Sequence, residues 1–64
     1  MNLYRVYKDN ELVSGPLASR EGAYMECVAR DADRVTESDV RYNLVEEIDR
    51  AECERRLREI RYPR

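Results

Sequence analysis

Six arginines lie close together at the C-terminal end of the chain, in the stretch DRAECERRLREIRYPR. An arginine-rich helix can neutralise the phosphates of a nucleic acid, and a neighbouring tyrosine can stack on a base. Three glutamates are interleaved with these arginines, so a solvated helix face explains the same pattern. The candidate nucleic-acid-binding residues are Arg55, Arg56, Arg58, Arg61 and Tyr62.

A second charged region, residues 31–49, carries seven carboxylates and two arginines. Such a ridge of negative charge can bind a basic surface of another protein, because complementary potential speeds encounter and sets the register of a complex. The alternative is a solvated loop and strand edge, in which Asp39 and Asp49 cap helices. The predicted acidic ridge, a partner-binding surface, consists of Asp33, Glu37, Asp39, Glu46 and Glu47.

The five tyrosines suggest a third kind of surface. Tyrosine is amphipathic and common in protein interfaces, so a sheet face presenting Leu3, Tyr7 and Tyr42 is a further predicted partner-binding surface. The alternative is that these rings cover the core and keep their hydroxyl groups in water. Single-stranded RNA also binds aromatic sheet faces, but the chain has no RNP-like basic-aromatic motif.

The residue types argue against catalysis and against a metal site. The chain has two cysteines, Cys27 and Cys53, and no histidine. Two thiols are too few for a four-ligand zinc site, and nucleophilic catalysis lacks its usual base. Adjacent Glu46 and Glu47 on a strand point to opposite faces, so they cannot share a proton as an acid–base dyad. We predict no enzyme, no metal and no cofactor, and we expect both cysteines as buried thiols.

The chain length of 64 residues predicts one small domain over residues 1–64. A chain this short buries only about 60% of the surface that its unfolded form exposes. No run approaches the roughly 20 apolar residues that span a bilayer, and the start MNLYRVYKDN lacks the features of a signal peptide. We therefore predict a cytoplasmic protein with no membrane segment.

The N-terminal residues are typical of a β-hairpin. LYRVY is rich in β-branched and aromatic residues, and the Asp-Asn pair of the KDNE that follows tolerates the positive φ of a tight turn. We expect strands over residues 2–8 and 11–15. Gly15 and Pro16 should end the second strand, because proline cannot donate a hydrogen bond to a sheet ladder.

A helix is expected over residues 20–31. Ser19 is a suitable N-cap, because its hydroxyl can accept a hydrogen bond from the first turn, and Glu21 complements the positive end of the helix dipole. Apolar residues recur with the period of a helix and predict the side that faces the core. This side carries Tyr24, Met25, Cys27, Val28 and Ala32.

Residues 39–48, DVRYNLVEEI, fit two structures. Apolar residues spaced by four from Val40 onward favour a helix, for which Thr36 and Asp39 fit a capping box. The alternation that also begins at Val40 favours a strand, as do the valines and the tyrosine, and the asparagine disfavours a helix interior. We predict a strand over residues 40–46 and keep the helix as the alternative.

A second helix is expected to begin after Asp49 and to end before Pro63. Asp49 and Glu52 form an analogue of the capping box, while Ile48 and Cys53 occupy the two positions of a hydrophobic staple. The apolar stripe of this helix consists of Cys53, Leu57 and Ile60.

These elements predict an α+β fold with the order ββαβα. The three strands are expected to form an antiparallel sheet of order 2-1-3, with both helices on one face. Tyr4 and Val6 would point to one face of the sheet, and Leu3 and Tyr7 to the other. Which of these faces is buried is left open, but the face without helices is free to meet a partner.

The expected architecture resembles that of small phage-encoded accessory proteins, including anti-CRISPR proteins. The chain shares with them a very short acidic sequence and the order of a hairpin (LYRVYKDNELVSG), a Ser-capped helix (SREGAYMECVA), a strand and a closing helix. Some of those proteins are single-domain binders that block a host complex. The resemblance implies an inhibitor that binds a host protein, and it assigns no role to any individual residue.

The sequence thus predicts a non-enzymatic protein-binding module. We expect it to dock on a protein partner, and to inhibit that partner, through the acidic ridge or the tyrosine-bearing sheet face. The first alternative is a nucleic-acid-binding module that uses the arginines of the C-terminal helix. The second is a small structural subunit that forms a homodimer through its open sheet face.

Overall fold

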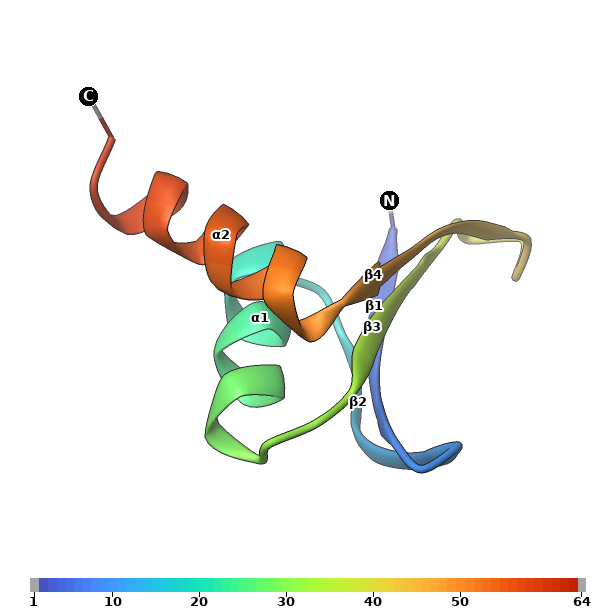
Figure 1. Ribbon diagram of the computed structural model, residues 1–64. Coiled ribbons are helices and arrows are strands. Elements are labelled where there is room, and N and C mark those ends of the chain that lie inside the picture. Colours follow the sequence, from blue (N-terminus) through green and yellow to red (C-terminus); the bar gives the residue numbers. More distant parts are fainter. Residues whose placement is uncertain (1, 64) are drawn as a thin grey trace.

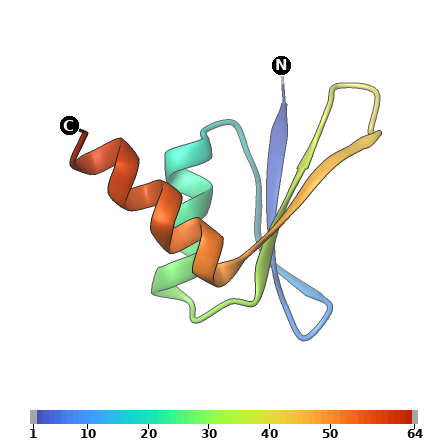
Figure 2. The same cartoon turned by 45° about the horizontal axis from the view of Figure 1, so that its top comes forward.

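The computed structural model describes residues 2–63, which form four strands and two helices (Figure 1). The strands are β1 (Leu3–Lys8), β2 (Glu11–Leu17), β3 (Arg34–Ser38) and β4 (Leu44–Asp49). The helices are α1 (Arg20–Ala29) and α2 (Arg50–Arg61). The strands form one antiparallel sheet in the order β2-β1-β3-β4. Both helices cover the same face of this sheet, and Figure 2 shows the opposite face without a helix.

The α+β class with two helices and an antiparallel sheet is confirmed, but the sheet has four strands instead of three. The strand predicted over residues 40–46 is confirmed only for residues 44–46, which belong to β4, and its helical alternative is wrong. A hairpin of β3 and β4 occupies this part of the chain, with residues 39–43 between the two strands. Asp39 caps no helix, because its Oδ1 accepts hydrogen bonds from the backbone N–H groups of Arg41 at 2.8 Å and Asn43 at 3.1 Å.

The N-terminal hairpin is confirmed, including its turn. Asp9 and Asn10 have φ values of 51° and 64°, which these two residue types tolerate. The expected end of the second strand at Gly15 is wrong, because β2 continues through Pro16. Proline is tolerated there because β2 lies at the edge of the sheet. Gly15 has a φ of 113°, and a Cβ at this position would lie 2.7 Å from the carbonyl oxygen of Tyr4, so the position requires glycine.

The predicted N-caps Ser19 and Asp49 are confirmed. Ser19 Oγ accepts a hydrogen bond from the N–H of Gly22 at 3.0 Å, and Asp49 Oδ1 accepts one from the N–H of Glu52 at 2.8 Å. The first helix is two residues shorter than expected. It ends before Asp31, whose φ of 53° lies in the left-handed region that terminates helices.

The core lies between the two helices and the covered face of the sheet. The sheet contributes Val6, Val35 and Ile48, and Ala23 of α1 is also buried, although it was not predicted for the core side. On the expected core side of α1, burial is confirmed for Tyr24, Cys27 and Ala32. It is wrong for Met25 and Val28, each 40% exposed.

The stripe of α2 is only partly buried. Cys53 is buried and Leu57 packs against the core, but Ile60 is exposed. Cys27 and Cys53 are free thiols in one buried cluster, and they donate to the carbonyl oxygens of Ala32 and Ile48, respectively. Burial raises the pKa of both thiols, and raises that of Cys53 to about 12.

Candidate functional site

The open face of the sheet carries a shallow hollow of about 440 Å³. Alternation along the strands directs Arg5 and Tyr7 of β1 to this face, and the pairing of β1 with β3 places them beside Thr36 and Arg34. The turn after β3 and the first residue of β4 form one side of the hollow. The hollow is lined by Arg5, Tyr7, Arg34, Thr36, Ser38, Tyr42 and Leu44.

Two of the three residues predicted for the tyrosine-bearing sheet face line this hollow. Tyr7 is half-buried within β1, whereas Tyr42 is 77% exposed in the turn between β3 and β4. Leu3 lies on the same face, opposite Ser38, but outside the hollow. The structure therefore brings together two tyrosines that are distant in the sequence.

The hollow also contains two arginines that the sequence did not single out. The guanidinium carbon of Arg34 lies 4.8 Å from the ring centroid of Tyr7, a cation–π contact. Arg34 Nε also lies 3.7 Å from Glu47 Oε2. Arg5 Nη1 donates a hydrogen bond to Ser38 Oγ at 2.9 Å. Among residues 2–63, Arg5 forms no ion pair.

A signal for Arg5 was present in β1, where it lies between Leu3 and Tyr7 on the face that alternation assigns to them. Arg34 could not be placed in the same way. Its position depends on the register of β3 against β1, and β3 was not predicted as a strand.

The acidic ridge predicted from the sequence is dispersed in the structure. Glu46 points toward α2, whereas Glu47 lies on the open face of the sheet. Asp33 and Asp39 accept backbone hydrogen bonds at the two ends of the β3 region. Glu37 is only 4% exposed. These five carboxylates therefore do not form one continuous surface.

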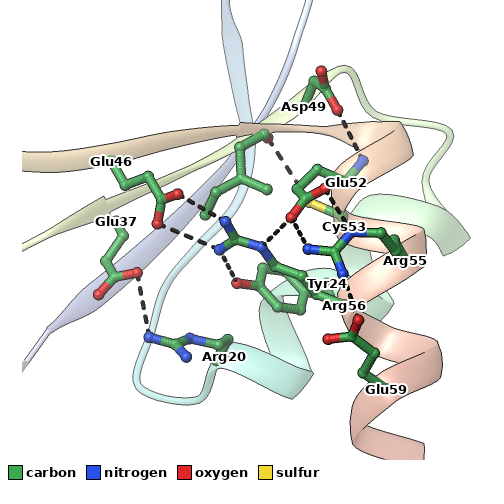
Figure 3. Close-up of polar contacts among 11 residues, drawn as sticks. Arg20, Tyr24, Glu37, Glu46, Asp49, Glu52, Cys53, Arg55, Arg56 and Glu59 are labelled. Carbon is green, nitrogen blue, oxygen red and sulfur yellow. Dashed lines mark hydrogen bonds and ion pairs between the residues drawn. The ribbon is translucent and has the colours of Figure 1, made fainter.

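Glu46 belongs instead to a network of ion pairs between the helices and the sheet (Figure 3). Arg56 Nη2 lies 2.8 Å from Glu46 Oε2, and Arg56 Nε lies 2.7 Å from Glu52 Oε2. Arg56 Nη1 also donates to the hydroxyl of Tyr24 at 3.2 Å. The hydrogen bond from Arg56 lowers the pKa of Glu46, and hydrogen bonds from Arg55 and Arg56 lower that of Glu52 to about 2. Arg56 thus ties α2 to β4 and α1.

Glu37 lies in the same layer as the Arg56 network, between the sheet and the helices. It lies directly opposite Glu46 on the neighbouring strand, an arrangement that is unfavourable for two like charges without counter-ions. Arg20 Nη2 lies 3.6 Å from Glu37 Oε1, and the amide of Asn2 donates to Glu37 Oε2 (Figure 3 shows the Arg20 contact). Arg20 and Arg56 therefore each neutralise one member of this pair, which is a structural role.

Most of the C-terminal arginines are also engaged within the molecule. Arg55 and Arg56 pair with glutamates of α2 and β4, and Arg61 Nε lies 3.8 Å from Glu21 Oε2. Arg58 forms no ion pair within residues 2–63, and Tyr62 is 76% exposed. The residues predicted to bind nucleic acid thus lie on α2 and its C-cap, but within residues 2–63 few of their charges are unpaired.

Within residues 2–63, no helix is long and apolar enough to cross a membrane, and no group of three or more potential ligands is arranged to hold a metal ion. Comparisons with protein-family models, with curated proteins and with solved structures found no match.

Proposed function

We propose that this chain is a non-enzymatic protein-binding module whose binding surface is the open face of the sheet. The observation that carries this proposal is the hollow in which Tyr7 and Tyr42 lie beside Arg5 and Arg34. Tyrosine and arginine are enriched among the residues that dominate the binding energy of protein interfaces. A hollow lined by both is therefore a suitable centre for an interface.

Exposed apolar side chains next to the hollow support the same proposal. Leu44 lines the hollow and is 62% exposed, and Val40 and Val45 are exposed in the same hairpin of β3 and β4. Figure 1 shows this hairpin projecting from the body formed by the helices and the sheet. Neighbouring exposed apolar residues of this kind mark interaction sites in small proteins.

The geometry favours the tyrosine-bearing face over the acidic ridge, because the acidic residues are dispersed and several are paired with arginines. A module of this kind acts by covering a surface of its partner, so we propose inhibition as its effect on that partner. Resemblance to phage-encoded inhibitors and a cytoplasmic location stay predictions from the sequence.

Binding of nucleic acid by the end of α2 is the second proposal. Arg58 and Tyr62 line a hollow of about 560 Å³ there, together with Arg55, Glu59 and Pro63. An exposed aromatic ring beside an unpaired cation suits an unstacked base next to a phosphate. The footprint is small, however, since affinity for nucleic acids grows with the number of phosphates that are neutralised.

Capture of partners from cell lysate, with and without nuclease, separates the two proposals. We expect the immobilised chain to retain a protein that mass spectrometry identifies in both conditions. Loss of all captured protein after nuclease treatment, together with recovery of nucleic acid before it, would contradict the first proposal and support the second.

A further inference from the structure

We infer that the hollow on the open face binds an acidic segment of a partner protein. In this complex the carboxylate of an aspartate or glutamate lies between Arg5 and Arg34, while an adjacent apolar side chain packs on Tyr7 and Tyr42. The inference rests on the proposed protein-binding function and adds the chemistry of the partner.

Arg5 is able to bind a carboxylate from a partner. Arg5 is half-buried, and its guanidinium donates a hydrogen bond to the neutral hydroxyl of Ser38. No carboxylate within residues 2–63 forms an ion pair with it. A guanidinium has five N–H donors and binds a carboxylate with two of them in parallel. Arg5 therefore has both the charge and the donors to bind a carboxylate from outside.

Arg34 contributes a second cation on the neighbouring strand. Its intramolecular ion pair uses Nε and is long, at 3.7 Å, and its partner Glu47 has a side chain that is 59% exposed. The Arg34 side chain is 25% exposed. A long pair with one largely exposed partner is weak, so Arg34 can exchange Glu47 for a better-placed carboxylate. Stacking on Tyr7 restricts the guanidinium before any partner arrives, which lowers the entropy cost of binding.

The remaining wall of the hollow is apolar or aromatic. Tyr42 and Leu44 are both mostly exposed on it, and Tyr7 forms part of the floor. A partner residue next to the carboxylate would bury these surfaces if its side chain were aliphatic or aromatic. The preferred segment therefore combines one acidic residue with one apolar neighbour.

The charge of the hollow also decides between this occupant and two others. The chain has a net charge of −2, but the hollow is lined by two arginines and no acidic residue. A nucleic acid fits it less well, because a polyanion needs a line of cations and would meet Glu47 at the border. A second copy is also a poor occupant. Two-fold symmetric stacking of this face would bring Arg5 and Arg34 of one copy close to the same residues of the other.

Selection from a library of random short peptides displayed on phage tests the inference directly. The full chain is immobilised, and the enriched peptides are expected to carry an aspartate or glutamate beside an aliphatic or aromatic residue. The best peptide is then synthesised and its dissociation constant is measured by fluorescence polarisation. We expect Arg5→Gln and Arg34→Gln each to weaken binding by roughly tenfold or more.

Two controls isolate the carboxylate contact. Arg30→Gln removes the same charge from the C-cap of α1, where Arg30 pairs with Glu26, and should leave peptide affinity unchanged. Replacing the acidic residue of the peptide by its amide should weaken binding to the unaltered protein as much as the arginine substitutions do. This second change needs no protein variant, so it stays informative if an arginine variant unfolds.

Enriched peptides that lack acidic residues, or equal binding of the peptide and its amide form, would overturn the inference. Failure to enrich any peptide would also overturn it. In these cases a protein partner captured from lysate that perturbs amide resonances of the hollow would leave the proposed protein-binding function standing. Displacement of the peptide by single-stranded oligothymidine at equal concentration would assign the hollow to nucleic acid. This result would contradict both the acidic-segment inference and the proposed protein-binding function.

Discussion

Tyr7 and Arg34 are direct cross-strand partners on β1 and β3, and the guanidinium of Arg34 lies over the Tyr7 ring at 4.8 Å. This contact joins the two central strands on the open face of the sheet. It fixes an aromatic ring and a cation at the floor of the proposed binding surface before a partner binds. The same contact makes Tyr7 a structural residue as well as a binding residue.

Replacing Tyr7 by leucine should therefore affect both stability and binding. Loss of the cation–π contact is expected to reduce the free energy of unfolding by roughly 0.5–1 kcal/mol, which urea denaturation would measure. Tyr62→Leu is the matched control, because Tyr62 is exposed at the end of α2. Equal stability of the two variants would show that the contact with Arg34 contributes nothing.

Gly15 provides a test of the hairpin. Gly15→Ala should reduce the free energy of unfolding by about 1–3 kcal/mol, because its φ of 113° and the nearby carbonyl oxygen of Tyr4 both disfavour a side chain. Gly22→Ala is the control in α1, where the added methyl meets only Ser19, at 3.5 Å. It should stabilise the protein by up to about 1 kcal/mol. Thermal unfolding that moves in the same direction for both variants would contradict this account of β2.

Acid should destabilise the protein through the Arg56 network. The pKa of Glu46 is lowered in the folded state, and that of Glu52 is lowered to about 2. These two carboxylates therefore contribute to the free energy of unfolding above the pKa of glutamate in the unfolded chain, roughly 4.3. Their contribution is lost as the pH falls toward about 2. We expect the urea concentration at the midpoint of unfolding of the parent protein to decrease as the pH is lowered from about 4.3 to about 2.

The Glu46→Gln and Glu52→Gln double variant checks this assignment. It should be less stable than the parent at neutral pH, and its urea midpoint should change less between about pH 4.5 and 2. Arg58→Gln should leave the pH profile unaltered. A double variant with the same acid dependence as the parent would place the titrating groups elsewhere.

The buried thiol pair should be unreactive in the folded protein. Burial raises the pKa of Cys53 to about 12 and also raises that of Cys27, so the thiolate that reacts with alkylating reagents is scarce near neutral pH. Mass spectrometry should find no iodoacetamide adduct at pH 8 in native buffer and two adducts in urea. Rapid labelling without denaturant would mean that α1 and α2 separate readily.

Local sequence signals predicted the parts of the fold that depend on near neighbours. The Asp-Asn turn, the Ser19 cap and the Asp49 cap each require only residues within one turn, and all three are confirmed. The β3 strand was missed because RVTES is short and polar and owes its burial to both neighbouring strands. The apolar alternation after it was then assigned to one strand although the β3–β4 turn interrupts it.

In the candidate site, too, residue type and near neighbours predicted some residues, whereas others depend on strand pairing. Tyr7 and Tyr42 were predicted for a sheet face, because tyrosine in a strand pattern is informative by residue type alone. Arg5 shares a face of β1 with Tyr7, but Arg34 becomes a neighbour of Tyr7 only through the pairing of β1 with β3. The acidic ridge was inferred from the density of carboxylates along the chain, which does not determine the face that each side chain occupies.

The most direct test of the open-face surface compares two matched double variants in the capture of a protein partner. Arg5→Gln with Tyr42→Ser alters the hollow, and Arg58→Gln with Tyr62→Ser makes the same changes at the end of α2. Circular dichroism confirms first that both variants are folded. We predict that the open-face variant loses the partner and that the helix variant retains it. Retention by the open-face variant together with loss by the helix variant would contradict the account.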